Sequence, residues 1–256
     1  MQTTDSPSGF AASAGRAAGR SLKPLIRRCT FVGSIVRVST ERPVIVLTYD
    51  DGPDPLGTTA ILEALEAKRA SATFFVLLTR VRRHPRLLDD ILAAGHEIGL
   101  HGLDHQRLSS LPYGTAKARL RDGKAELEDL TGQLIRWMRP PYGAQTFATW
   151  HAIRTTNLEP VMWNRTTWDS RNVSQQERVA MATQRPISGT ILLAHDGFAG
   201  EADGVGDGPE PTVDRGRLTT LILEEFQARG LSGCSLEAAL EQGTAVREGW
   251  FTRKEG

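Results

Sequence analysis

The sequence predicts an α/β fold, a distorted (β/α) barrel of about seven parallel strands in a single domain. Beyond residue 40, short β-branched and aromatic runs alternate with stretches in which apolar residues recur at helical spacing. This alternation is typical of parallel strands joined by helices that cover the sheet. About seven strand candidates favour an irregular barrel over a flat doubly wound sheet. The 256-residue chain is 39% hydrophobic, enough for one sizeable core.

Three strands and two helices are expected in the first part of the domain. An apolar run predicts a strand at 44–49, and apolar residues at helical spacing predict a helix over 61–68. Residues 72–77 are β-branched and aromatic, which indicates a strand. The apolar stripe of 87–95 ends at a glycine, as helices often do, and 97–100 is the next strand.

The second part continues the alternation. Apolar residues at helical spacing across a strongly charged stretch predict a long helix over 116–134. Apolar runs predict strands at 135–138, 161–163 and 190–193. A last helix is expected over 218–230, because its apolar stripe is followed by a glycine.

The folded domain is expected to span 41–245. Residues 1–40 are predicted to form an N-terminal tail that is largely disordered or variable, and 246–256 a C-terminal tail. No clear secretory signal follows the Ala-, Gly- and Ser-rich start, so a disordered basic tail is expected there, with a targeting segment as the alternative. A cytoplasmic location is favoured. The Gly/Asp/Pro-rich stretch 198–211 is predicted to be a long surface loop beside the site.

Charge and cysteine content exclude several classes of protein. The formal net charge is +1 and no basic stripe interleaved with aromatic residues occurs, so nucleic acid is not an expected partner. No apolar run approaches the roughly 18 residues that span a bilayer, and no protein partner is implied. Cys29 and Cys234 match no metal or redox spacing, and two free thiols are expected.

Polar residues follow the predicted strands at the points where the strands end. They are Asp50, Asp51, His101, His105, Arg139 and His195. The carboxyl ends of parallel strands converge on one face, which holds the site, so these side chains are expected to meet. Two carboxylates, three histidines and an arginine suffice for a metal-assisted hydrolase.

His101 and His105 form a candidate metal-ligand pair. Three residues separate them, a spacing that places both imidazoles on one side of a helical turn. Two imidazoles and one carboxylate are a common ligand set for catalytic Zn²⁺, with a position left open for water. The adjacent Asp50 and Asp51 repel one another unless a cation or a proton separates them. A metal bound by one, with the other free as a base, resolves that conflict, and the turn at Gly52 lets both reach the pocket.

Arg139 and His195 are candidates for supporting roles. Two prolines stiffen the loop that carries Arg139, a setting suited to holding a carboxylate in bidentate geometry. His195 is a candidate general acid, because the charge state of histidine adjusts readily near neutral pH; a buried core histidine is the alternative. Asp169 lies a few residues beyond the 161–163 strand, where it could orient that imidazole and raise its pKa.

At these residues the chain resembles the polysaccharide deacetylases of carbohydrate esterase family 4, which have the NodB homology domain. Residues 48–53 (TYDDGP) are similar to the family's TFDDGP block, and 101–105 (HGLDH) to its H[ST]xxH block. Residues 139–142 (RPPY) are similar to its RxPY block, and 193–195 (LAH) to its LxH block. The resemblance covers roughly 43–243, with the blocks in the family's order.

The resemblance implies a distorted (β/α) barrel and a role for each residue at the metal. Asp51, His101 and His105 would bind one divalent ion, with zinc favoured and cobalt or nickel as alternatives. Asp50 would be the base that takes a proton from the metal-bound water, and Arg139 would hold its carboxylate. The family reaction removes acetyl groups from N-acetylglucosamine units, or less often from O-acetylated xylan, and releases acetate.

The resemblance also implies roles on the substrate side. His195 would protonate the leaving amine, tuned by Asp169. The backbone N–H of Tyr142, together with the metal, would stabilise the tetrahedral oxyanion. Trp163 and Trp168 are candidate contacts of the sugar.

Three positions depart from the family pattern. Gly102 stands where the family usually has Ser or Thr, so the hydroxyl that steadies the histidine loop is absent. Thr166 and Ser170 replace the first Asp and the Trp of the family's DxxDW block, whereas Asp169 matches its second Asp. The catalytic atoms are unaffected, but the sugar subsite changes, and Trp168 is a candidate substitute for the missing aromatic wall.

The leading hypothesis is a metal-dependent hydrolase that removes N-acetyl groups from N-acetylglucosamine-type amino sugars. The substrate can be a polysaccharide, an oligosaccharide or a small glycoside. One alternative is an O-acetyl esterase on acetylated carbohydrate with the same catalytic residues. The other is a non-catalytic sugar-binding relative, in which the base or a metal ligand should be missing.

Overall fold

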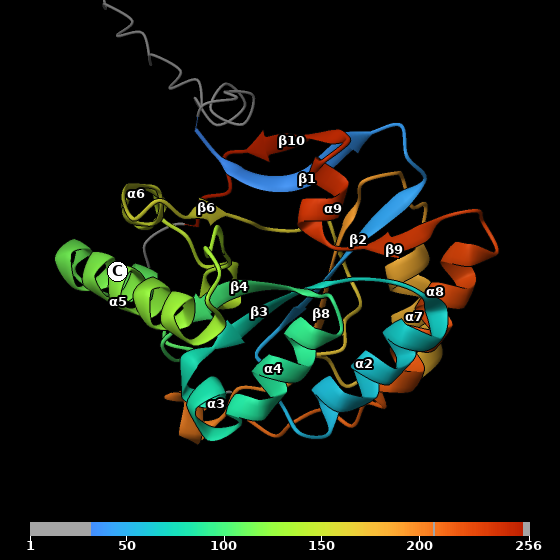
Figure 1. Cartoon of the computed structure of the whole chain (residues 1–256), viewed down its shortest axis with the longest axis horizontal. Coiled ribbons are helices and arrows are strands. Elements are labelled where there is room, and N and C mark those ends of the chain that lie inside the picture. Colours follow the sequence, from blue (N-terminus) through green and yellow to red (C-terminus); the bar gives the residue numbers. More distant parts are fainter. Residues whose placement is uncertain (1–31, 207, 253–256) are drawn as a thin grey trace, which may run out of the picture.

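The main sheet of the protein curls into a half-barrel of parallel strands (Figure 1). The structure, a computed structural model, describes residues 32–206 and 208–252. Seven strands follow one another in the order β6-β5-β4-β3-β2-β8-β7, and β9 pairs with the start of β2. The seven are β2 (Val44–Asp50), β3 (Thr73–Leu77), β4 (Glu97–Gly102), β5 (Trp137–Met138), β6 (Glu159–Pro160), β7 (Arg165–Thr166) and β8 (Ile191–His195), and the eighth strand of the sheet is β9 (Ser232–Cys234). The predicted distorted (β/α) barrel is confirmed.

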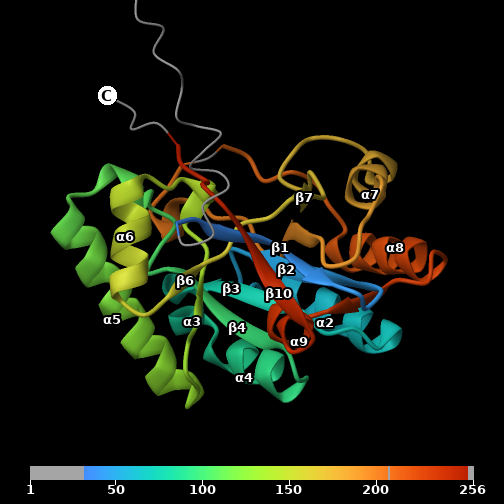
Figure 2. The ribbon, with the colours of Figure 1, turned by 90° about the horizontal axis from the view of Figure 1, so that it is seen from above.

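Helices connect the strands. All but the last cover the outer side of the sheet, whereas Leu236 and Ala239 of the last helix pack into the core on the inner side. The helices are α2 (Gly57–Lys68), α3 (Leu78–Arg83), α4 (Pro85–Ala93), α5 (Tyr113–Thr131), α6 (Phe147–Thr155), α7 (Gln175–Thr183), α8 (Arg215–Gln227) and α9 (Leu236–Leu240). Figure 2 shows α5 and α6 at one end of the molecule and α7 with α8 at the other. Among the described residues, no helix is both long and apolar enough to cross a membrane.

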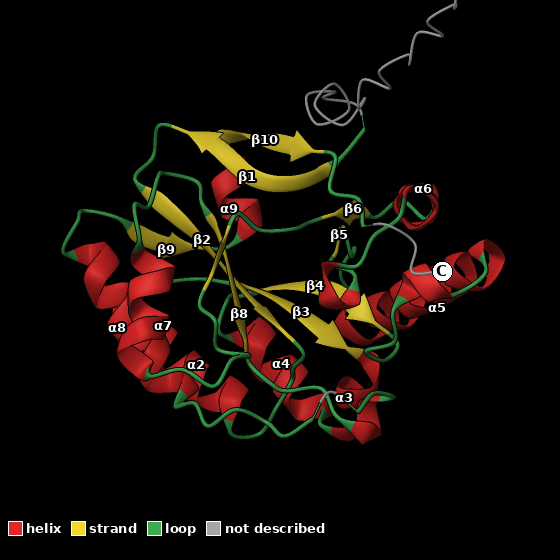
Figure 3. Ribbon diagram, turned by 180° about the vertical axis from the view of Figure 1, so that it is seen from behind, coloured by secondary structure: helices red, strands yellow, loops and turns green. Residues whose placement is uncertain are grey.

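A two-stranded antiparallel sheet covers the inner side of the half-barrel (Figure 3). It consists of β1 (Ser34–Thr40) and β10 (Gly243–Glu248). Ile35 and Val38 of β1 are fully buried. The predicted domain boundaries at residues 40 and 245 therefore need correction, because both strands belong to the fold. Their pairing is non-local, so the local sequence pattern did not reveal either strand, although β1 is as long as β2. Cys29 and the rest of 1–31 lie outside the described residues.

Other predicted elements match in position more than in length. The four expected helices correspond to α2, α4, α5 and α8. The strand expected at 161–163 lies two residues earlier as β6, and Val161 makes only a single bridge, to Ile35. The stretch 198–211, expected to be a surface loop, contains a 3₁₀ helix, Glu201–Asp203. Asp203 is buried, so this stretch is not simply a surface loop.

Strand β2 positions the site through its alternation of faces. Ile45, Leu47 and Tyr49 pack into the core beneath the helices, whereas Val44 and Val46 pack into the inner core beneath β1. Successive side chains of a strand point to opposite faces, so the even-numbered residues that follow also face inward.

The register of β2 determines which residues meet at its carboxyl end. Asp50, the last residue of β2, is paired with Phe75 of β3 on one side and with His195 of β8 on the other. The sheet therefore brings together two polar residues that lie far apart in the sequence.

The buried imidazole of His96 makes stability depend on pH. The residue lies between α4 and β4 with 8% of its surface exposed, and its ring lies 5.5 Å from that of Phe74. Burial lowers the pKa of His96 from 6.5 to about 4. The unfolded chain thus binds this proton more readily, so the stabilisation is present above pH 6.5 and is lost as the pH falls toward 4.

We expect the free energy of unfolding to fall by about 2 kcal/mol more in the natural protein than in His96→Asn between pH 7 and pH 5. Urea denaturation of both proteins at each pH measures this difference, and the variant is the control for all other titrating groups. Parallel pH dependence of the two proteins would contradict the prediction.

Candidate active site

A cavity of about 370 Å³ opens at the carboxyl ends of the strands. Most of the predicted site residues line it: Asp50, Asp51, His101, His105, Tyr142, Trp163, Asp169 and His195. Arg139 lies beneath this cavity, fully buried, and Trp168 lies outside its lining. The residues selected from the ends of separate strands therefore share one pocket.

Asp51, His101 and His105 form a cluster of potential metal ligands. Oδ1 of Asp51 lies 3.2 Å from Nε2 of His101 and 3.3 Å from Nε2 of His105, and all three residues are buried. Burial favours the neutral acid, but the neighbouring histidines hold the pKa of Asp51 well below its usual value. The local arrangement therefore favours an ionised carboxylate facing two imidazole nitrogens.

The donor set fits a divalent cation. Oδ1 of Asp51 is buried without a hydrogen-bond partner among the described residues, as expected of an oxygen reserved for a metal. Nδ1 of His101 lies 2.7 Å from the main-chain oxygen of Arg139. Donation of the Nδ1 proton to that oxygen leaves the lone pair on Nε2, which faces Asp51. Two nitrogens and one carboxylate oxygen suit Zn²⁺, Co²⁺ or Ni²⁺.

Asp51 reaches the cavity because the backbone turns at this residue. Its φ is +76°, a left-handed conformation that is uncommon outside glycine. Adjacent side chains, which would diverge on a regular strand, here both line the pocket. At Gly52 an added Cβ would lie 1.9 Å from Oδ2 of Asp196, so only glycine fits next to that carboxylate.

The two histidines converge through a bend after a strand. His101 lies in β4, and the chain bends after Gly102, whose φ is +149°. A Cβ at Gly102 would lie 2.6 Å from the carbonyl oxygen of Asp104, so a serine or threonine would not fit this bend. The expectation that His101 and His105 share a helical turn is therefore wrong, although their rings lie only 5.3 Å apart.

Asp50 is held by a buried arginine. Nη1 of Arg139 lies 2.7 Å from Oδ1 of Asp50 and 2.8 Å from Oγ1 of Thr48. The remaining guanidinium nitrogens donate to the carbonyl oxygens of Val161 and Met162. The contact to Asp50 involves one carboxylate oxygen, so the predicted bidentate geometry is not observed.

His195 and Asp169 form the second charged pair of the cavity. Nδ1 of His195 lies 2.8 Å from Oδ1 of Asp169, and the other carboxylate oxygen accepts from the His195 main-chain N–H at 2.7 Å. Burial by itself lowers the pKa of His195, but the charge and hydrogen bond of Asp169, with smaller contributions from Asp51 and Asp50, raise it to about 9. The imidazole is therefore protonated at neutral pH in the metal-free protein.

The aromatic side of the cavity differs from the prediction. Trp163 lines it, and Trp250 packs behind with ring centroids 5.2 Å apart. Trp250 lies in the stretch expected to be a tail, and its Nε1 donates to the main-chain oxygen of Gly143. Trp168 instead packs against the guanidinium of Arg171, 4.6 Å from its ring centre. The wall is thus built by Trp163 and Trp250.

Sequence reasoning missed several polar residues around the site. Asp196 is buried and accepts from Gly52 N–H at 2.9 Å and from the Thr58 hydroxyl at 2.6 Å. Burial raises the pKa of Asp196 to about 7. Its position directly after β8 was the available signal, the same one that identified Asp50. Asp203 and Arg80, also buried, gave no comparable signal because their roles depend on non-local pairing.

Comparison with known proteins agrees with this geometry. The polysaccharide deacetylase family pattern matches residues 37–161. A peptidoglycan-N-acetylglucosamine deacetylase of Bacillus cereus is 32% identical over 165 residues, which cover 62% of this chain and 76% of that protein. A chitooligosaccharide deacetylase of Azorhizobium caulinodans is 28% identical over 209 residues, 78% of this chain and 96% of that protein. The chain belongs to the polysaccharide deacetylase family.

Solved structures share the fold. A CE4 family pseudoenzyme from Bacillus anthracis superposes with a TM-score of 0.71 over 82% of this chain and 69% of that chain, at 20% identity. At this identity the likeness concerns the fold alone.

The Asp169–His195 pair predicts a measurable titration. In the metal-free protein, NMR should give a His195 pKa near 9, and Asp169→Asn should lower it by about 1–3 units, because an adjacent opposite charge favours the protonated form. The pair's contribution to stability is full below pH 6.5 and is lost as the pH rises through 9. Ser170→Ala, at the neighbouring position, is the control and should leave the titration unchanged. A His195 pKa near 6.5 in both the natural protein and Asp169→Asn would refute the assignment.

Proposed function

We propose that this protein is a metal-dependent hydrolase that removes N-acetyl groups from N-acetylglucosamine-type amino sugars and releases acetate. The observation that carries the proposal is the different setting of two adjacent carboxylates. Asp51 faces two imidazole nitrogens, whereas Asp50 faces the guanidinium of Arg139. One carboxylate is thus suited to a metal and the other to a proton. The similarity to a peptidoglycan-N-acetylglucosamine deacetylase and to a chitooligosaccharide deacetylase supports the same chemistry.

Asp51, His101 and His105 would hold the cation. When bound, a divalent ion lowers the pKa of a water molecule and polarises a carbonyl oxygen. Asp50 acts as the general base and accepts the proton of the attacking water, while Arg139 orients its carboxylate through the 2.7 Å contact. The arginine has no exposed surface, so it acts on Asp50 and not on the substrate.

His195 acts as the general acid. Its imidazolium, stabilised by Asp169, donates a proton to the amide nitrogen as the C–N bond breaks, so the sugar leaves as a neutral amine and the acyl group as acetic acid, which loses its remaining water-derived proton to solvent and becomes acetate. The main-chain N–H of Tyr142 is assigned to the oxyanion of the tetrahedral intermediate. Base and acid lie beside one another in the register of β2 and β8, as the two proton transfers require.

The cavity has a size suited to an N-acetylated sugar unit. Its volume of about 370 Å³ is near the lower end for small-molecule sites. Trp163 forms an apolar wall suited to a sugar face, and Ser170 stands at the exposed side. The complete set of base, acid and ligand residues favours catalysis over the non-catalytic alternative.

Acetate release tests the proposal. We expect the metal-loaded protein to release acetate from at least one of chitooligosaccharides, peptidoglycan fragments or small N-acetylglucosaminides, assayed in parallel. Activity that rises with chain length would assign a polymer substrate, and activity confined to small glycosides a small-molecule one. Faster turnover of matched O-acetyl sugars with no amide turnover would assign an esterase instead. Absence of acetate from every amide substrate would refute N-deacetylation.

Substitution of Asp50 and of His101 separates the role of the base from that of a metal ligand. Asp50→Asn should retain the metal but lose on the order of 10²-fold or more in turnover, because the proton acceptor is removed. His101→Ala should lose the metal itself. Metal content by elemental analysis and turnover are measured on the same samples. Equal metal loss in both variants would contradict the division of roles.

A further inference from the structure

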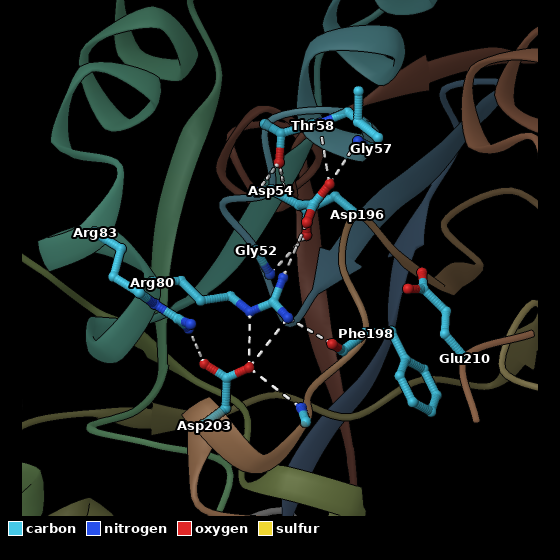
Figure 4. A network of polar contacts seen from close by, with 12 residues as sticks. Gly52, Asp54, Gly57, Thr58, Arg80, Arg83, Asp196, Phe198, Asp203 and Glu210 are labelled. Atoms are coloured by element: carbon cyan, nitrogen blue, oxygen red, sulfur yellow. Dashed lines mark hydrogen bonds and ion pairs between the residues drawn. The ribbon is translucent and has the colours of Figure 1, made fainter. Parts of the chain in front are cut away.

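A buried carboxylate outside the cavity accepts hydrogen bonds from several side chains. Asp203 follows β8 in the 3₁₀ helix Glu201–Asp203, and only 2% of its side chain is exposed. Arg80 donates to it from Nε at 3.1 Å and lies 3.0 Å away through Nη2. Arg83 also donates to it (Figure 4). The Thr79 hydroxyl is a further donor, at 3.0 Å. Three residues of one short chain segment therefore hold one carboxylate.

The same residue contacts a predicted metal ligand through its main chain. The main-chain N–H of His105 donates to the carbonyl oxygen of Asp203 at 2.9 Å. His105 lies beyond the end of β4, so no strand pairing holds its peptide. Gly102, in the bend before it, has no side chain that could brace the loop. The segment around Asp203 supplies an external support instead.

Arg80 extends this support to other parts of the site. Its side chain is 11% exposed, and it contacts Asp54 at 3.3 Å and the main-chain oxygen of Phe198. Asp54 follows the Asp51 turn and accepts from the N–H of Gly57 at 2.8 Å, and Phe198 lines the cavity. One guanidinium thus joins the loops after β2, β3 and β8.

We propose that Asp203 is a positioning residue for the metal ligand His105, and that Arg80 and Arg83 hold it in place. The inference rests on the proposed metal-dependent function. The two arginines restrain the Asp203 carboxylate, the carboxylate restrains the 3₁₀ helix, and the carbonyl oxygen of that helix restrains the His105 peptide. The imidazole is thereby kept at the separation from Asp51 and His101 that a metal requires.

Loss of the Asp203 charge should act on metal affinity more than on folding. Asp203→Asn keeps the size of the side chain, but an amide accepts less strongly and places a donor next to two guanidinium groups. The carbonyl oxygen that accepts from the His105 N–H remains in this variant, but the side-chain contacts that hold it in position are weakened. Removal of groups that orient metal ligands typically costs 10–100-fold in metal affinity.

The experiment is a titration of the chelator-stripped full chain with Co²⁺, followed by visible absorption, and with Zn²⁺ in competition with a chelating dye. We expect Asp203→Asn to weaken binding of both ions by about 10–100-fold and to alter the Co²⁺ spectrum. Circular dichroism of the metal-free proteins monitors folding. A merely structural role would change thermal stability but not the affinity or spectrum of the folded fraction.

Glu126→Gln is the matched control. Glu126 also pairs with an arginine of α3, because Nε of Arg82 lies 2.6 Å from its Oε1. This pair is on the surface, and among the described residues its side chains form no hydrogen bond to residues 101–105. Metal affinity in this variant should match that of the natural protein. Affinity within twofold of the natural value in Asp203→Asn, or an equal loss in Glu126→Gln, would overturn the proposal.

A second variant covers the case in which Asp203→Asn does not fold. Arg83→Gln removes one of the two arginines and should weaken metal binding by a smaller factor in the same direction. Unchanged affinity in folded Arg83→Gln would then overturn the proposal. A natural protein that binds no metal would refute the proposed function itself, whereas tight binding in both the natural protein and Asp203→Asn would refute only the role of Asp203.

Discussion

Arg139 is a charged side chain with no exposed surface, and the site around it depends on how that charge is compensated. A buried cation without partners costs several kcal/mol, so it persists only where its donors are satisfied. Here they meet Asp50, Thr48 and the carbonyl oxygens after β6. The main-chain oxygen of Arg139 also accepts from His101. One residue therefore orients both the proposed base and a proposed metal ligand.

The charges above Arg139 are separated by pairing each carboxylate with a different partner. Asp50 is paired with the arginine, Asp51 with two histidines and Asp169 with His195. Asp196 forms no ion pair among the described residues, and burial, opposed in part by the Thr58 hydroxyl and the charges of Arg80 and Arg215, raises its pKa to about 7. Four acidic groups can occupy one end of the barrel because each has its own means of compensation. As a result, the pKa of Asp51 is held below its usual value, whereas the pKa values of Asp196 and His195 are raised.

Much of the fold and most of the candidate site could be predicted from local sequence patterns. The apolar run before Asp50 identified β2, and the same pattern before His195 identified β8. Convergence at strand ends then followed from the geometry of parallel sheets. Patterns of this kind failed where a residue's role depends on distant partners. Trp250 was assigned to a tail, because its contact with the distant Trp163 produces no pattern in the sequence around residue 250.

The sequence by itself determined the class of fold, the identity of the polar residues at the strand ends and the family to which they belong. Hydrophobic periodicity and short motifs involve residues close together in the chain, so they can be recognised from the sequence alone. Only the tertiary structure decided that Asp51 turns through a left-handed conformation, that His105 is reached by a bend and not a helical turn, and that Asp203 supports it. These features arise from contacts between residues far apart in the chain, and their geometry exists only once the strands have paired.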